Sequence, residues 1–154
     1  MKLNIRKFKS KCGNHQFASW FYEYSMQNPL GVVGLNPSIT KEGRNLTVSA
    51  LSKIAKREGF DSLFITNLYS YITPDPKQLK KVDIPVLEAN DYWIQKMTIY
   101  CKKILCIWGN NPDESRIIEV TPIIKHKAYS IGFTKSGQPR HVLHTKLDVP
   151  LIRL

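Results

Sequence analysis

The stretch of residues 31–38, GVVGLNPS, restricts the fold more than any other part of the chain. Its short apolar run predicts a buried strand. The strand has to stop at Asn36, because Pro37 has no backbone N–H with which to continue a central strand. The Asn36 carboxamide is therefore expected at the carboxyl end of a strand, where open α/β sheets bind their ligands. The competing interpretation is that Asn-Pro only initiates a turn.

Strands and helices are expected to alternate along the rest of the chain. Further strands are predicted at residues 63–67, 104–108 and 128–132. Helices are predicted at residues 47–58, 88–102 and 113–120, with Gly59 as a helix cap and Pro122 as a helix end. Such alternation implies crossovers between parallel strands. We therefore expect one α/β domain over residues 1–154, with three layers (α/β/α) around a mostly parallel sheet of about four strands.

The two ends of the chain carry weaker patterns. Residues 1–8 alternate loosely and predict an edge strand. Residues 15–24 are rich in aromatic side chains and fit either a strand or a short helix. The tail at 142–154 fits a final short helix or an extended segment.

The balance of charge is strongly basic, with 23 Lys and Arg residues against 12 acids and a net charge of +11. Residues 1–22 hold five cations and no acid, and residues 125–154 hold six cations and one acid. If the two ends lie on one face, that face would attract phosphate groups. The alternative is a charge that serves solubility. A basic helix lying on a membrane is disfavoured, because neither end has a clear amphipathic pattern.

Several classes of protein are disfavoured. No apolar run is long enough to span a bilayer, and an odd cysteine count of 3 without a secretion signal favours a cytoplasmic protein. No glycine-rich phosphate loop is present, so no nucleotide cofactor is expected. The pairs Cys12/His15 and His141/His144 have the spacing of metal ligands, but they lie at opposite ends of the chain. We therefore expect no metal.

Polar residues also follow the later strands. Asn67 ends the second apolar run, and His141 closes a donor-rich loop after the fourth. Parallel strands point their carboxyl ends the same way, so Asn36, Asn67 and His141 are expected in one crevice. A carboxamide offers a donor and an acceptor together, which suits the edge of a nucleobase or the orientation of a water. Alternatively, Asn67 caps a loop and His141 is a surface histidine.

The chain resembles a bacterial and phage family known as domain of unknown function 1643. The matching pieces are Cys12-Gly13, Trp20, Leu35-Asn36-Pro37-Ser38, Thr47, Gly59, Asn67-Leu68-Tyr69, Thr73-Pro74, Asn90-Asp91, Trp108-Gly109, Thr134-Lys135-Ser136-Gly137 and Pro139-Arg140-His141. Together they run in order across most of the chain.

The order of these motifs is also similar, more distantly, to the uracil-DNA glycosylase superfamily. That resemblance implies a fold of the same kind, with Asn36 orienting a water, Asn67 reading the edge of the base and His141 stabilising the leaving base. It implies a glycosylase-like protein that recognises, and excises, a nucleobase in nucleic acid. Further substrate contacts are expected from Pro37, Ser38, Tyr69, Thr134 and Lys135, and phosphate contacts from Arg140, Lys7 and Lys9.

Two other functions stay open from the sequence. One is a nucleic-acid-binding protein without turnover, and the other is an enzyme that acts on a free nucleotide or another small anion. In the second case Lys135 and Arg140 would clamp the phosphate. The expected partner is thus nucleic acid, DNA rather than RNA, or a nucleotide.

Overall fold

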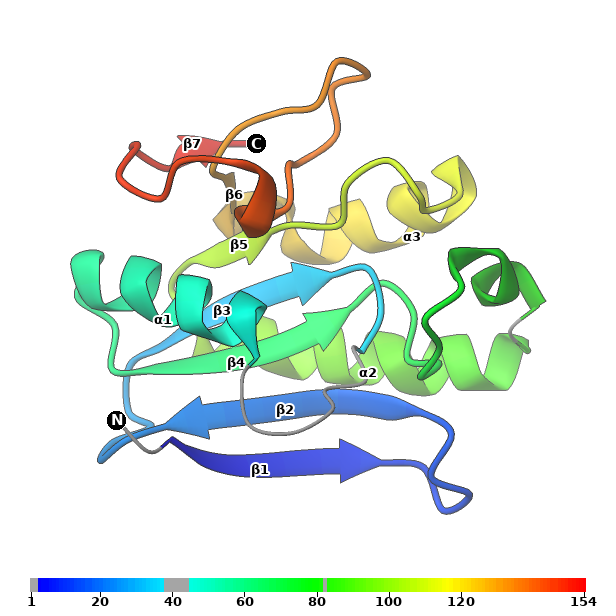
Figure 1. Ribbon diagram of the computed structural model, residues 1–154. Helices are drawn as coiled ribbons and strands as arrows, with labels where there is room; N and C mark the ends of the chain where they lie inside the picture. The colour runs from blue at the N-terminus through cyan, green and yellow to red at the C-terminus, as the bar shows by residue number, and fades with distance from the viewer. Residues whose placement is uncertain (1–2, 38–44, 82) are drawn as a thin grey trace.

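A single sheet organises the chain in the computed structural model, which describes residues 3–37, 45–81 and 83–154 (Figure 1). Its strands are β1 (Asn4–Lys9), β2 (Gln16–Tyr22), β3 (Pro29–Gly34), β4 (Ser62–Asn67), β5 (Ile104–Cys106), β6 (Ala128–Ser130) and β7 (Ile152–Arg153). The helices are α1 (Leu46–Arg57), α2 (Ile84–Tyr100) and α3 (Glu114–Ile124). Three short 3-10 helices are η1 (Pro76–Lys81), η2 (Lys125–Lys127) and η3 (Val142–His144).

The sheet is larger and more mixed than predicted. Its 7 strands, within the described residues, lie in the order β1-β2-β4-β3-β5-β6-β7. Neighbours in the central block β4-β3-β5-β6 are parallel, and the pairs β1/β2, β2/β4 and β6/β7 are antiparallel. The prediction of about four, mostly parallel strands was therefore wrong for the whole sheet. The aromatic segment that fitted a strand or a helix is β2, which joins the hairpin β1/β2 to the parallel block.

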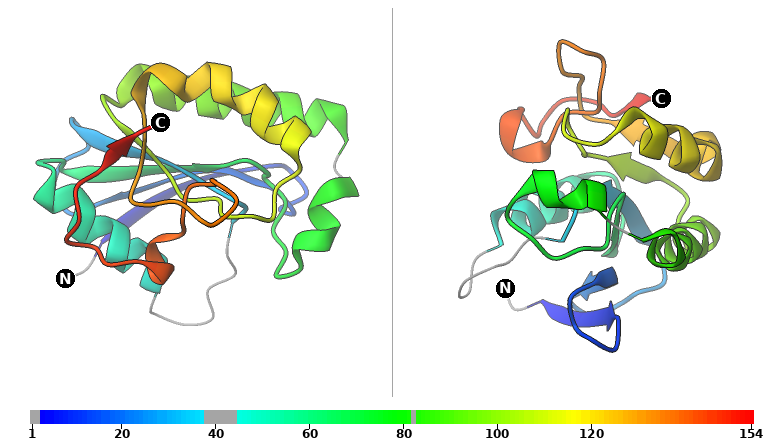
Figure 2. Two further views of the ribbon diagram at one scale, coloured as in Figure 1. Left: turned by 90° about the horizontal axis from the view of Figure 1, so that it is seen from above. Right: turned by 90° about the vertical axis from the view of Figure 1, so that its right-hand side faces the viewer.

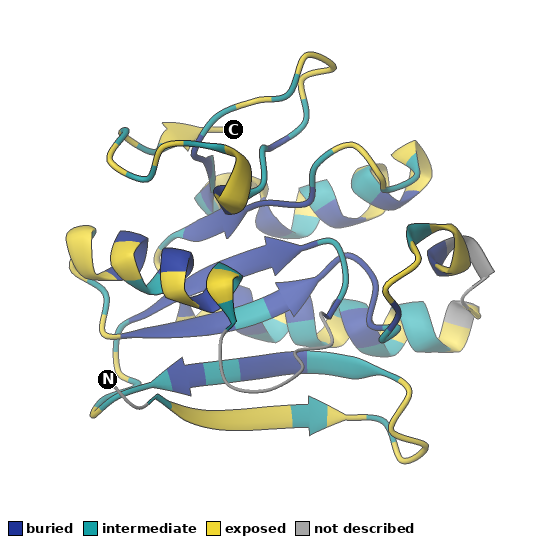
Figure 3. Cartoon of the chain, viewed as in Figure 1, coloured by how far each residue is buried: buried dark blue, intermediate teal, exposed yellow. Residues whose placement is uncertain are grey.

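Helices cover both faces of the sheet (Figure 2). Side chains alternate between the two faces of a strand, so a strand buried on both faces contributes to two cores. In β3, Leu30 and Val32 pack in the core beneath α1, whereas Val33 packs in the core beneath α2 and α3. Every residue of β3 is buried, while most of β1 is exposed (Figure 3).

The helix α1 forms where its periodicity predicts. Val48, Leu51 and Ile54 lie on its buried face, and Asn45 caps its start by accepting a hydrogen bond from the Val48 amide at 3.1 Å. Gly59 follows the end of the helix with a φ of 82°, the left-handed conformation that glycine adopts without a steric penalty.

The bounds of the other two helices differ from the predicted ones. The helix α2 begins earlier, because Pro85 lies in its first turn, where no backbone donor is needed. The helix α3 continues through Pro122 to Ile124, so the predicted end at this proline was wrong. A proline removes one hydrogen bond of the helix, and the burial of Val120 and Ile124 on either side keeps the last turn on the sheet.

We predict that Gly31→Ala lowers the free energy of unfolding by about 1–3 kcal/mol, because the added methyl group overpacks the core. A Cβ at this position would lie 3.1 Å from side-chain atoms of Met97, Cys101 and Ile104. Urea denaturation of the variant and the parent protein measures the change. Equal midpoints for the two proteins would contradict this close packing between β3 and α2.

Candidate ligand-binding site

Two adjacent strand ends bring Asn36 and Asn67 to the same edge of the sheet. The parallel register pairs Gly34 of β3 with Asn67 of β4. The pairing continues beyond the strands, since the amide of Leu68 donates to the oxygen of Gly34 at 2.9 Å and the amide of Tyr69 to the oxygen of Leu35 at 3.0 Å. The prediction that Asn36 and Asn67 share one edge is thereby confirmed.

A cavity of about 910 Å³ opens at this edge, on the face of the sheet that carries α1. Its walls come from β1, β2, the loops after β3, β4 and β5, the first turn of α1 and the segment 134–144. The lining includes the predicted residues Lys7, Asn36, Pro37, Asn67, Thr134, Lys135, Arg140 and His141. Chain segments from both ends of the sequence therefore meet at one concave site of the size that binds small ligands.

The nitrogen of the Asn36 carboxamide is bonded within the protein, whereas its oxygen is available to a ligand. Its Nδ2 group donates to the backbone oxygens of Thr73 at 2.8 Å and Tyr71 at 3.2 Å. Only the NH2 end of a carboxamide can face carbonyl oxygens, so these contacts fix the orientation of the group. Its Oδ1 accepts no hydrogen bond from another described residue, and it remains an acceptor for a water or a ligand.

The Asn67 side chain is a buried polar group in the cavity wall. The residue is only 7% exposed, yet its carboxamide makes no hydrogen bond to any described residue. A Cβ at position 34 would lie 2.6 Å from Asn67 Oδ1 and would clash with it. The side chain of Asn67 can therefore take this position only because residue 34 is glycine. A buried carboxamide normally finds partners within the protein. Asn67 is therefore placed to bind a ligand.

His141 contributes a donor to the cavity. Its Nδ1 accepts a hydrogen bond from the amide of Leu143 at 3.2 Å, which leaves the ring proton of the neutral histidine on Nε2. Burial lowers the pKa of His141, and the nearby His144 lowers it further. The neutral form, which donates from Nε2 without carrying a charge, is thus favoured.

The cavity is positively charged. Lys7 comes from the N-terminal part of the chain, and Lys135 and Arg140 come from the C-terminal part. Among the described residues, none of those that line the cavity is Asp or Glu. The terminal strands β1 and β7 lie at opposite edges of the sheet, so the chain ends as a whole do not form one face. Among the lysines and arginines that the structure describes, only these three line the cavity, and Lys9 lies outside it.

Hydrogen bonds between side chains connect the segment that carries Lys135 and Arg140 to the loop after β5. The indole of Trp108 donates to Gln138 Oε1 at 2.9 Å, and the hydroxyl of Thr134 donates to Asn110 Oδ1 at 2.7 Å. Thr134 lines the cavity, but its hydroxyl donates to Asn110 and can offer a ligand only its oxygen as an acceptor. Arg140 donates from one terminal nitrogen to the oxygen of Phe133 at 2.9 Å, which holds its guanidinium beside the cavity.

Two predicted substrate contacts lie elsewhere. Ser38 falls outside the described residues. Tyr69 is buried on the other face of the sheet and does not line the cavity. Its hydroxyl accepts a hydrogen bond from the amide of Asp113 at 3.2 Å, directly before α3. The structure thus places Tyr69 beneath the site, in the packing between β4 and α3.

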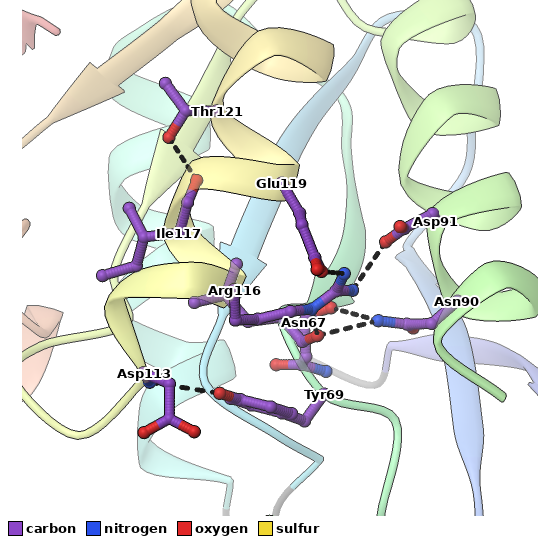
Figure 4. A network of polar contacts seen from close by, with 10 residues as sticks. Asn67, Tyr69, Asn90, Asp91, Asp113, Arg116, Ile117, Glu119 and Thr121 are labelled. Carbon is purple, nitrogen blue, oxygen red and sulfur yellow. Dashed lines mark hydrogen bonds and ion pairs between the residues drawn. The ribbon is translucent and has the colours of Figure 1, made fainter. Parts of the chain in front are cut away.

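A buried polar network that the sequence did not reveal holds the end of β4 (Figure 4). The Asn90 carboxamide donates to the backbone oxygens of Asn67 at 2.8 Å and Leu68 at 3.1 Å. Arg116 is 3% exposed, and its Nε donates to the oxygen of Leu68 at 2.7 Å, while its terminal nitrogens bind Asp91 at 2.6 Å and Glu119 at 3.1 Å. The helices α2 and α3 thereby fix the backbone from which Asn67 projects.

The cysteines and histidines do not assemble into a metal centre in the described part of the chain. His15 instead bonds through Nδ1 to the hydroxyl of Ser70 at 2.9 Å. Cys101 and Cys106 are buried, and burial raises the pKa of Cys101 to about 12, so both are inert core thiols. None of the helices in residues 3–37, 45–81 and 83–154 combines the length and apolarity that crossing a membrane requires.

The sheet and its edge define an open α/β protein with a cationic cavity at the carboxyl ends of its parallel strands. Residues 19–143 match the family described as protein of unknown function DUF1643, and the chain belongs to this family. The resemblance found in the motifs is thereby confirmed for this family. No curated protein and no solved structure matches the chain.

We predict that Arg116→Met lowers the free energy of unfolding by about 2–4 kcal/mol, because it removes charged hydrogen bonds inside the protein. Urea denaturation measures this loss. Arg57→Met is the control, since Arg57 has 32% of its side chain exposed and makes its contacts to Glu58 and to the oxygen of Leu147 at the surface. Such a pair contributes less than about 1 kcal/mol. Equal losses in the two variants would contradict a structural role for the buried network.

We predict that acidification destabilises the protein partly through His141. Its pKa in the folded state is lowered by burial, so the unfolded chain takes up the proton first as the pH falls. The free energy of unfolding should therefore fall between about pH 7 and pH 5, and less so in His141→Gln. Burial lowers the pKa of His15 too, so part of the fall should remain. An equal fall in variant and parent would contradict the prediction.

Proposed function

We propose that this protein is glycosylase-like: it recognises a nucleobase of a nucleic acid in the cavity and hydrolyses the N-glycosidic bond of that nucleotide. The observation that carries the proposal is the meeting of Asn36 Oδ1, the Asn67 carboxamide and His141 around one cavity. The distant resemblance to the uracil-DNA glycosylase superfamily assigns the same three positions to water, base and leaving group. Each position has the hydrogen-bonding group that its role requires.

The chemistry follows from these groups. When the bond between C1′ and the base nitrogen breaks, its electron pair stays on the base and the sugar takes on oxocarbenium character. Water then adds to C1′, its proton is released to solvent, and the base leaves after protonation. Nε2–H of His141 donates to the base oxygen on which charge develops, which stabilises the departing anion. Oδ1 of Asn36 accepts a hydrogen bond from the water and aims it at C1′.

The residues that line the cavity fit a dissociative reaction of this kind better than one that needs a strong base. None of the described lining residues is a carboxylate that could act as a strong base. A sugar cation that has already formed needs a placed water more than a strong base, so an amide is sufficient at Asn36. Lys7, Lys135 and Arg140 would hold the phosphates that flank the nucleotide, after the base has left the stack. Binding should weaken with salt.

Base release tests the proposal directly. The protein is incubated with DNA and RNA oligonucleotides that carry different modified bases, and mass spectrometry identifies any released base. Release from one class of oligonucleotide is the expected result. Salt-dependent binding with no release would instead support the non-catalytic alternative. Binding of a mononucleotide without binding of long DNA would support an enzyme for free nucleotides.

Single substitutions separate the three roles. We predict that His141→Ala slows base release by about 100- to 1,000-fold, the usual cost of losing one donor to a developing anion. His126→Ala is the control, because His126 is exposed and lies outside the cavity. Asn67→Asp should change which base is accepted, since it replaces a donor with an acceptor. Unchanged release in His141→Ala would exclude the assigned role.

Asn36→Ala should abolish release and also cost stability. The sequence places the Asn36 carboxamide at the end of a strand, and there its Nδ2 donates to the backbone oxygens of Tyr71 and Thr73 and so holds the loop. Losing these hydrogen bonds should lower the free energy of unfolding by about 1–3 kcal/mol. Activity of this variant is therefore compared at a temperature at which both proteins are folded.

A further inference from the structure

We infer that the start of α1 is a phosphate subsite of the cavity, and that the phosphate of the bound nucleotide lies there while its base reaches Asn67. The inference rests on the proposed function and adds the orientation of the ligand in the cavity, from the start of α1 to the end of β4. It also adds the backbone donors of the helix to the cations of the cavity as phosphate-binding groups.

The first observation is the open end of α1. Asn45, Thr47 and Val48 line the cavity. The amide of Val48 is bonded to Asn45 Oδ1, but those of Leu46 and Thr47 have no acceptor within the helix or elsewhere in the described residues. No acidic side chain lies in the first turn of this 12-residue helix to occupy its positive end. Such an end binds anions.

The second observation is independent of the helix. Asn67 is 7% exposed and directs an unpartnered carboxamide into the same cavity. The amide atoms of Asn67 are open to the cavity, and because no described residue bonds to them, their partner has to be water or a ligand. The ligand therefore has a polar, uncharged edge at the sheet and a negative charge at the rim. A base and a phosphate joined by a sugar provide both.

The third observation concerns the surroundings of the helix end. The 3-10 helix η3 packs against α1, with Val142 in the same core as Val48. This packing brings His141 and His144, which flank Val142, to the wall of the cavity beside α1. Lys135 and Arg140 approach from the segment before them. Backbone amides, the Thr47 hydroxyl and these two cations together suit the oxygens of a phosphate.

Calorimetric titration with nucleoside 5′-monophosphates and the matching nucleosides tests the subsite. The parent protein should bind a monophosphate roughly 10-fold or more tightly than its nucleoside, as charged hydrogen bonds predict. Thr47→Glu should remove this preference, because it places a carboxylate at the subsite. The fold should survive, since an acid in the first turn stabilises a helix.

Ser49→Glu is the matched control. It makes the same charge change two residues along the same helix, at an exposed position outside the cavity, and should bind within about twofold of the parent. Melting temperatures of both variants confirm folding. Nucleosides binding as tightly as monophosphates, or equal losses in the two variants, would overturn the inference.

A short oligonucleotide without a terminal phosphate distinguishes the two sources of the phosphate. Loss of mononucleotide binding alone in Thr47→Glu identifies a free nucleotide, and loss of both identifies a phosphodiester of a strand. The proposed function can fail separately: a monophosphate preference that depends on residue 47, with no base release, would keep the subsite and remove the catalysis. Base release that is unaffected by Thr47→Glu would keep the catalysis and remove the subsite.

Discussion

The parallel pairing of β3 with β4 is the constraint on which the site depends. The hydrogen bonds continue past the last residues of the strands, through the amides of Leu68 and Tyr69. Two chain segments that would otherwise diverge are thus held side by side where their polar residues begin. Gly34 completes the arrangement, because the missing side chain leaves room for the carboxamide of Asn67. The position of Asn67 is therefore a property of the backbone pairing.

The two faces of the sheet have different roles. The α1 face carries the cavity and its charges, whereas the opposite face carries the network of Asn90 and Arg116 that holds the end of β4. A buried guanidinium is costly unless its donors are satisfied, and here every contact is made to a backbone oxygen or a carboxylate. The face that carries α2 and α3 holds the end of β4 in place, and the face that carries α1 gives a ligand access to it.

The centre of the molecule was predictable from the sequence, and its periphery was predictable in part. The apolar runs that end in Asn36 and Asn67 correspond to strands buried on both faces, where the pattern is strongest. The strand β7 has only two residues, which is too short for a pattern of side chains to predict a strand. The strand β1 was predicted as an edge strand, which the order of the sheet confirms, but its antiparallel pairing with β2 was not predicted.

The candidate site shows the same limit. Asn36, Asn67 and His141 could be proposed because a strand end or a motif marks each of them. Arg116 could not, because in the sequence it is one more arginine on a helix, and only the packing of α3 against α2 buries it. Tyr69 was assigned to the substrate because it follows Asn67, yet it lies beyond the end of β4, where the alternation of a strand no longer sets the direction of side chains, and it packs on the other face.

The exposed strand β1 has a consequence for the molecule in solution. An open strand edge is a template on which another chain can add, and long apolar edges lead to aggregation. In β1 the charged residues Arg6, Lys7 and Lys9 point to both faces of the ribbon, and only Phe8 is partly covered. A second copy that approached this edge would bring the same cations opposite these. Charge repulsion therefore opposes the pairing of a second copy at this edge.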